Sequence, residues 1–122
     1  MSDEKPRQDL RLRTKRFALR IIKMCSSLPD SRAERILGNQ VFRSGTSVGA
    51  NYREAYRARS RAEFISKLGD SQKELEETIY WLELLVDSGT VKPKKLSLLL
   101  QESDELMAIL SSIIKSSKDG SS

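Results

Sequence analysis

Apolar side chains recur at alternating three- and four-residue steps along most of this chain, which is the spacing of one face of an α-helix. The clearest case lies between residues 61 and 88, where the repeating positions are Ile65, Leu68, Gln72, Leu75, Ile79, Leu82 and Val86. A second such run lies between residues 94 and 117 and is interrupted by Ser103. A 3.5-residue period of this kind predicts helices that pack lengthwise on one another, with Gln72 and Ser103 as buried polar groups that set helix register.

Two more helices are predicted upstream. Residues 9–27 place Phe17, Ala18, Ile21 and Cys25 on one face, and residues 32–57 place Val41, Gly45, Val48, Tyr52 and Ala55 on one face. Gly45 and Gly49 lie one turn apart, although a glycine inside a helix costs about 1 kcal/mol relative to alanine. This pair therefore predicts that another helix backbone packs closely against the second helix.

The predicted helices have recognisable start and stop signals. The segments 31–34 and 60–63 both have the Ser-x-x-Glu pattern of a capping box, Gly89 is placed as a C-terminal cap, and Pro93 permits a fourth helix. The connection over residues 58–60 is short, so the second and third helices should be antiparallel neighbours. We predict an all-α, antiparallel up-down-up-down four-helix bundle over residues 9–117, with disordered segments at 1–8 and 118–122.

Composition narrows the functional classes. At 122 residues the chain is one domain, and it has no apolar stretch of about 18 residues that would span a membrane. A polar N-terminus without a signal peptide and a single cysteine, Cys25, fit a reducing cytoplasm. There is no histidine, phosphate-binding glycine loop, Cys/His cluster or nucleophile elbow. We therefore expect no catalytic residues, no metal and no cofactor, and a protein that is not an enzyme.

The net charge of +5 is unevenly distributed. Residues 1–30 carry eight Lys/Arg against four Asp/Glu and residues 31–60 carry six against two, whereas residues 61–90 carry three against seven. A basic first half and an acidic third quarter indicate either a polyanionic partner or self-association through unlike faces.

The basic candidates gather on the second helix and the turn after it. The predicted nucleic-acid-binding residues are Arg43, Arg53, Arg57, Arg59 and Arg61. Guanidinium groups grip phosphates, and the nearby Tyr52 and Tyr56 would offer rings for base stacking. A solvated charged face explains the same pattern equally well. Asn51 and Glu54 are interpreted as a hydrogen-bond network that fixes helix packing, with Arg43 as a partner.

A different set of residues points away from the predicted core. The predicted oligomer interface consists of Leu12, Arg16, Leu19, Arg20, Lys23, Glu63, Asp70, Glu74, Glu77 and Trp81. The first helix contributes the basic and aliphatic members, and the third helix contributes the acidic members and Trp81. These are two different faces of one chain, so pairing them is heterologous and can close a ring.

Three segments carry a family resemblance: residues 43–55 (Arg-Ser-x-x-Ser-Val-x-Ala-Asn-x-x-Glu-Ala), residues 60–65 (Ser-x-x-Glu-Phe-Ile) and residues 73–82 (Lys-Glu-x-x-Glu-Thr-x-Tyr-Trp-Leu). In combination they resemble the four-helix-bundle family of 23S ribosomal RNA intervening-sequence proteins. That family is similar to the accessory variability determinant proteins of diversity-generating retroelements, which bind nucleic acid and a reverse transcriptase. The resemblance implies a bacterial, non-enzymatic bundle that assembles as a homopentameric ring with basic surfaces.

Two hypotheses follow for the function. The first is a non-enzymatic bundle that binds nucleic acid, RNA before DNA, and assembles as a homo-oligomeric ring. The alternative is an assembly scaffold or adaptor that recruits a protein such as a reverse transcriptase, without direct nucleic-acid contact.

Overall fold

Four long helices make up the fold. The computed structural model describes residues 5–119, with side chains from Leu10 onward. The helices are α1 (Lys5–Ser26), α2 (Arg32–Tyr56), α3 (Arg61–Asp87) and α4 (Pro93–Lys118), and the described residues contain no strand. The predicted all-α, up-down-up-down four-helix bundle is confirmed.

The helix ends differ slightly from the predicted ones. α1 begins at Lys5, so residues 5–8 are helical although disorder was expected there. Pro6 lies in the first turn, where a missing N–H removes no intrahelical hydrogen bond. α4 likewise continues to Lys118. The predicted disorder of residues 1–4 and 120–122 lies outside the described residues.

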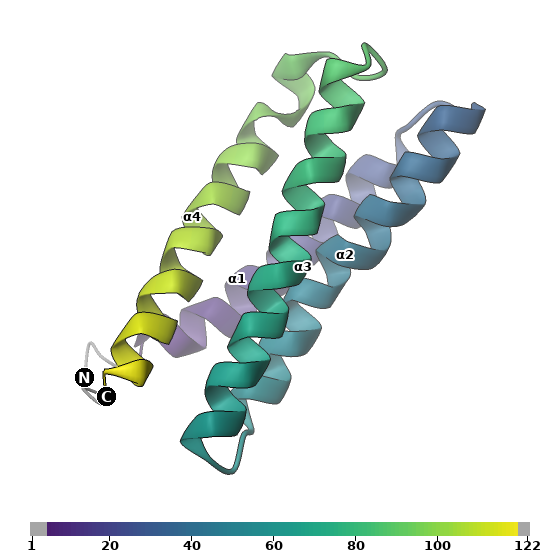
Figure 1. Cartoon of the computed structure of the whole chain (residues 1–122). Coiled ribbons are helices and arrows are strands. Elements are labelled where there is room, and N and C mark those ends of the chain that lie inside the picture. The colour runs from purple at the N-terminus through teal and green to yellow at the C-terminus, as the bar shows by residue number, and fades with distance from the viewer. Residues whose placement is uncertain (1–4, 120–122) are drawn as a thin grey trace.

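Helix α3 occupies the middle of the bundle. It packs most extensively against α2 on one side and against α4 on the other, while α1 packs on α2 and meets α4 only slightly. Figure 1 shows α1 passing obliquely behind the other three helices, with the start of α1 and the end of α4 at the same end of the molecule. Because α1 and α4 contact each other only slightly, a hollow remains between them on the surface of the bundle.

The glycine pair of α2 lies where α1 crosses. A Cβ atom at Gly45 would lie 2.8 Å from Ile21 Cγ1, and one at Gly49 would lie 3.0 Å from Thr14 Oγ1. Both distances are too short for comfortable packing, so the two glycines admit α1 at this crossing. The predicted close approach of another helix is confirmed.

Small hydroxyl side chains line the contact between α2 and α3. The Ser71 hydroxyl donates a hydrogen bond to the Val48 carbonyl at 2.7 Å, and Thr78 Oγ1 lies 2.8 Å from Ser44 Oγ. Ser44, Ser71 and Thr78 are fully buried, and their hydrogen bonds satisfy polar groups that burial would otherwise leave costly. Ser103 is also buried, but its hydroxyl donates to the Leu99 carbonyl of its own helix, so this hydrogen bond does not set the register between helices.

Capping differs between the two predicted boxes. The Ser60 side chain accepts a hydrogen bond from the Glu63 N–H, as predicted, and Glu63 Oε1 accepts one from the N–H of Arg59, the residue before the N-cap. The Ser31 side chain makes no such bond, although α2 does begin at Arg32. Gly89, with φ +81°, ends α3 in the left-handed region that glycine tolerates, as predicted.

Candidate nucleic-acid interface

A shallow basic groove runs between α1 and α2. It includes a hollow of about 210 Å³ whose floor is formed by small residues of both helices, among them Ala18, Gly49 and Ala50. The groove is shallow because these residues bring the two helices close and leave no bulk at their junction. Lys15 and Arg53 supply the only charges in its lining, so an anion in the hollow meets cations from both sides.

An aromatic group lies near the same end of α2. The Arg11 guanidinium carbon lies 4.5 Å from the centroid of the Tyr56 ring, within the range of a cation–π contact. Tyr56 is 40% exposed and packs against Tyr52 at a centroid distance of 6.5 Å. Tyr52 itself is fully buried, so it offers no ring to a base, and only Tyr56 of the predicted pair remains a candidate.

The structure brings four of the five predicted arginines to one end of the bundle. Arg53 lines the hollow, Arg57 follows the last residue of α2, Arg59 lies in the connecting turn, and Arg61 opens α3. All four are exposed, and none takes part in an ion pair among the side chains of residues 10–119. Their positive charges are therefore not neutralised by neighbours in this part of the chain.

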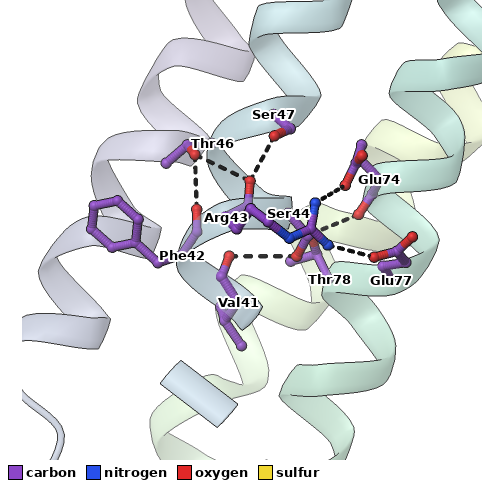
Figure 2. Close-up of polar contacts among 9 residues, drawn as sticks. All are labelled: Val41, Phe42, Arg43, Ser44, Thr46, Ser47, Glu74, Glu77 and Thr78. Atoms are coloured by element: carbon purple, nitrogen blue, oxygen red, sulfur yellow. Dashed lines mark hydrogen bonds and ion pairs between the residues drawn. The ribbon is translucent and has the colours of Figure 1, made fainter. Parts of the chain in front are cut away.

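Arg43, the fifth predicted arginine, has a different role. Its guanidinium group donates to Glu77 Oε1 at 2.7 Å and to Glu74 Oε1 at 3.3 Å, which joins α2 to α3 (Figure 2). The hydrogen bond to Glu77 raises the pKa of Arg43, and both carboxylates add to the effect. Two carboxylates balance the charge of Arg43, so it is a weaker candidate for phosphate binding than the other four predicted arginines.

The predicted hydrogen-bond network joined Asn51 and Glu54 to Arg43, but Arg43 is not the partner of Glu54. Glu54 pairs instead with Lys67 of α3 at 2.8 Å, and this hydrogen bond raises the pKa of Lys67. The network thus consists of separate bridges from α2 to α3, spaced along the same junction. Each links side chains that are partly exposed to solvent and contributes little to stability on its own.

The acidic and aromatic half of the predicted oligomer interface needs correction. Glu74 and Glu77 are bound by Arg43, Glu63 caps α3, and Trp81 is half-buried and packed against the core. Glu74 and Glu77 lie on the side of α3 that faces α2, and α3 has helices on two sides, so its buried arc is wider than the apolar period suggested. Asp70 is exposed.

Other residues form the exposed face of α3. Glu76, Tyr80, Glu83 and Asp87 recur at three- and four-residue steps and are all exposed, Tyr80 by 54%. The sequence did not reveal this stripe, because the solvent-exposed side of α3 was predicted to lie directly opposite its one line of apolar residues. Tyr80 also packs edge-on against Trp81, with ring centroids 5.1 Å apart.

The basic half of the predicted interface divides between two surfaces. Leu12, Arg16 and Leu19 are exposed on α1, Leu19 by 55%. Arg20 and Lys23 are exposed too, but they line a hollow between α1 and α4 together with Leu98. Sequence reasoning missed Lys15 as a residue of the groove and Arg11 as the partner of Tyr56. Their four-residue spacing was a signal, but packing decides which side of α1 meets α2.

Other kinds of site find no support in the described residues. No group of three or more His, Cys, Asp and Glu residues there is placed to hold a metal ion. No helix among residues 5–119 is both long enough and apolar enough to cross a membrane. Cys25 donates a hydrogen bond to the Gly38 carbonyl at 3.4 Å, and burial raises the pKa of its thiol, which disfavours the reactive thiolate.

Comparisons with known proteins agree on the type of protein. Residues 8–112 match the family model of the 23S rRNA-intervening sequence protein. A crystal structure of a protein of unknown function from the S23 ribosomal protein family of Bacteroides thetaiotaomicron is 39% identical, with a TM-score of 0.84. That similarity covers 90% of this chain and 98% of the other. A comparison with curated proteins finds no match.

Proposed function

The chain belongs to the 23S rRNA-intervening sequence protein family, and on that premise we propose that it binds single-stranded RNA along the groove between α1 and α2. The observation that carries the proposal is the lining of this groove, in which Lys15 and Arg53 flank small residues and no carboxylate takes part. RNA is the polyanion proposed because the family's description refers to 23S rRNA.

The shape of the groove favours a single strand over a duplex. Small residues form its floor, so one phosphate backbone fits between Lys15 and Arg53 without side chains in the way. A single strand also has unpaired bases, which stack on aromatic rings and on arginine guanidinium planes. The Arg11–Tyr56 pair would provide such a platform beside the phosphates.

Removal of the arginine cluster tests this function. Arg53→Ala, Arg57→Ala and Arg59→Ala together should weaken binding of a fluorescein-labelled single-stranded RNA to a similar extent for unrelated sequences. The slope of log K against log salt should flatten by up to about two units, since each lost phosphate contact on a single strand removes about 0.7. Fluorescence anisotropy over a salt series measures both quantities.

A matched control removes the same charge elsewhere. Arg32→Ala, Lys92→Ala and Lys94→Ala also delete three exposed positive charges that take part in no ion pair among residues 10–119, but at the opposite end of the bundle (Figure 1). Tyr56→Ala should additionally weaken single-strand binding by about 1–3 kcal/mol with little effect on a duplex, whereas Tyr80→Ala should change neither. Equal losses in both triple variants, with the fold intact, would contradict a site on the α1–α2 groove.

A second candidate function is assembly of the chain into a homo-oligomeric ring, which the family resemblance implies to be a pentamer. Such a ring could act as a scaffold that recruits a protein such as a reverse transcriptase. It is favoured by Leu12, Leu19 and Tyr80, which leave large apolar groups exposed on a lone bundle. The basic surface of α1 and the acidic stripe of α3 are complementary in charge, so the two would pair head to tail. The two functions are compatible, because the α1–α2 groove includes neither the α3 stripe nor these two leucines.

A further inference from the structure

A second groove opens between the C-terminal half of α1 and the start of α4. Two adjoining hollows of about 400 and 380 Å³ share Met24, Ser27 and Lys95 in their linings. The groove exists because α1 and α4 meet only slightly and no other helix covers the space between them. It is distinct from the α1–α2 groove, with which it has no lining residue in common.

The floor of this groove is apolar. Leu98 is 69% exposed, more than any other large apolar side chain of the described residues, and Met24, Leu99 and Val91 also line the hollows. Methionine and leucine side chains adapt their shape to an inserted apolar group, as they do in grooves that accept amphipathic helices. Contact between water and these apolar side chains is unfavourable, and burial of the side chains by an apolar partner would lower the free energy.

The rim is positively charged on both sides. Arg20 and Lys23 come from α1, and Lys92 and Lys95 come from the start of α4, while no carboxylate lines either hollow. None of these four cations forms an ion pair with any side chain of residues 10–119. α4 also begins here without a side-chain cap and with no acidic residue in its first turn, so its N-terminal dipole adds to the positive potential.

From this combination we infer that the groove between α1 and α4 is a docking site for an acidic amphipathic helix of a partner protein. Apolar side chains at i, i+3, i+4 and i+7 of that helix lie on Met24, Leu98 and Leu99. Carboxylates on its two flanks meet Arg20 and Lys23 on one side and Lys92 and Lys95 on the other. Nucleic acid fits this surface less well, because the groove offers an exposed aliphatic floor and no aromatic ring.

The test uses a designed peptide and the full chain. The probe is a fluorescein-labelled helical peptide of about 18 residues, long enough to span about 27 Å, with a leucine stripe flanked by glutamates. Its control has lysine at every glutamate position. By fluorescence anisotropy at about 150 mM salt, the acidic peptide should bind saturably in about the micromolar range, and the lysine peptide should not.

Variants of the chain locate the binding site. Leu98→Asp should weaken the acidic peptide at least about tenfold, because it places a carboxylate in the apolar floor. Ile36→Asp is the matched control, since it places the same charge at another exposed aliphatic residue, one that lines neither hollow and belongs to no proposed interface, and it should leave the affinity within about twofold. Lys23→Glu with Lys95→Glu should weaken the acidic peptide and create affinity for the lysine peptide.

Several results would overturn this inference. Equal binding of both peptides, or an acidic peptide that binds Leu98→Asp as well as the unaltered chain, would exclude the site. A smaller assembly mass of Leu98→Asp by light scattering, before peptide is added, would show that a second copy of the chain occupies the groove. Loss of affinity for poly(U) in Leu98→Asp, comparable to the loss for the peptide, would assign the groove to RNA instead.

Discussion

At the scale of single residues, glycine positions in this protein differ sharply in what surrounds them. Gly45 faces Ile21 of α1 so closely that even a methyl group has no room, whereas a Cβ at Gly69 would meet nothing within 4 Å. Both lie inside long helices, where glycine is unfavourable relative to alanine. The same substitution should therefore have opposite effects at the two positions.

Gly69→Ala should raise the free energy of unfolding by about 0.5–1 kcal/mol, because it removes backbone freedom from the unfolded chain and adds no clash. Gly45→Ala should lower it by about 1–2 kcal/mol, because overpacking against Ile21 outweighs the gain in helix propensity. Urea denaturation followed by circular dichroism measures both. Stabilisation by Gly45→Ala would mean that α1 does not cross α2 at this point.

At the scale of the helices, the slight contact between α1 and α4 is reinforced by one charged cluster. Arg13 Nε donates to Glu102 Oε2 at 2.7 Å and Arg13 Nη2 donates to Glu102 Oε1 at 2.8 Å, while Nη2 also reaches Glu105 at 2.7 Å. The hydrogen bond to Glu102 raises the pKa of Arg13, so this arginine stays charged at any pH at which the protein would be studied.

A double-mutant cycle of Arg13→Met and Glu102→Gln should give a coupling free energy of about 1–2 kcal/mol, since the pair is bidentate and its side chains are only 33% and 17% exposed. The Arg35–Asp30 pair serves as the control. Its side chains are 59% and 87% exposed, and its coupling should be about 0–0.5 kcal/mol. Unfolding in urea supplies all the values, and equal couplings for the two pairs would refute a tether between α1 and α4.

At the scale of the whole molecule, the charges and apolar groups that face outward separate by helix. α1 and the end of α2 present cations with Leu12 and Leu19, and α3 presents Glu76, Tyr80, Glu83 and Asp87. Other charged residues, such as Arg43 and Glu77, are paired with each other in salt bridges between α2 and α3 of the same bundle. The surface that remains is therefore the one available to RNA, to partners and to other copies of the chain.

Assembly is tested by replacing one exposed apolar group on each proposed face. Leu19→Ser with Tyr80→Ser should yield a folded but smaller species by light scattering, because apolar contacts supply most of the affinity of such an interface. Trp81 is unsuitable for this purpose, since it packs against the core. Ile36→Ser, also at an exposed apolar residue, is the control. A monomeric unaltered chain at micromolar concentration, or an unchanged mass of the double variant, would rule this interface out.

Much of the fold follows from local sequence alone. The helical period, the glycine that ends α3, the capping box at Ser60 and the short connection after α2 predict four antiparallel helices, and these signals act within a few residues of one another. The Gly45–Gly49 pair even indicates where another helix crosses. Such features are local because backbone hydrogen bonding and conformational preference depend on near neighbours.

Only the tertiary structure decided which charges remain free. Arg43 and Arg53 lie on the same helix, yet Arg43 is paired with Glu74 and Glu77 from α3, whereas Arg53 lies open beside Lys15 from α1. The rotation of each helix about its axis is set by two neighbours at once, through contacts between residues far apart in sequence. For this reason the sequence by itself identified a basic bundle, while packing determined which of its arginines form ion pairs with neighbouring helices and which do not.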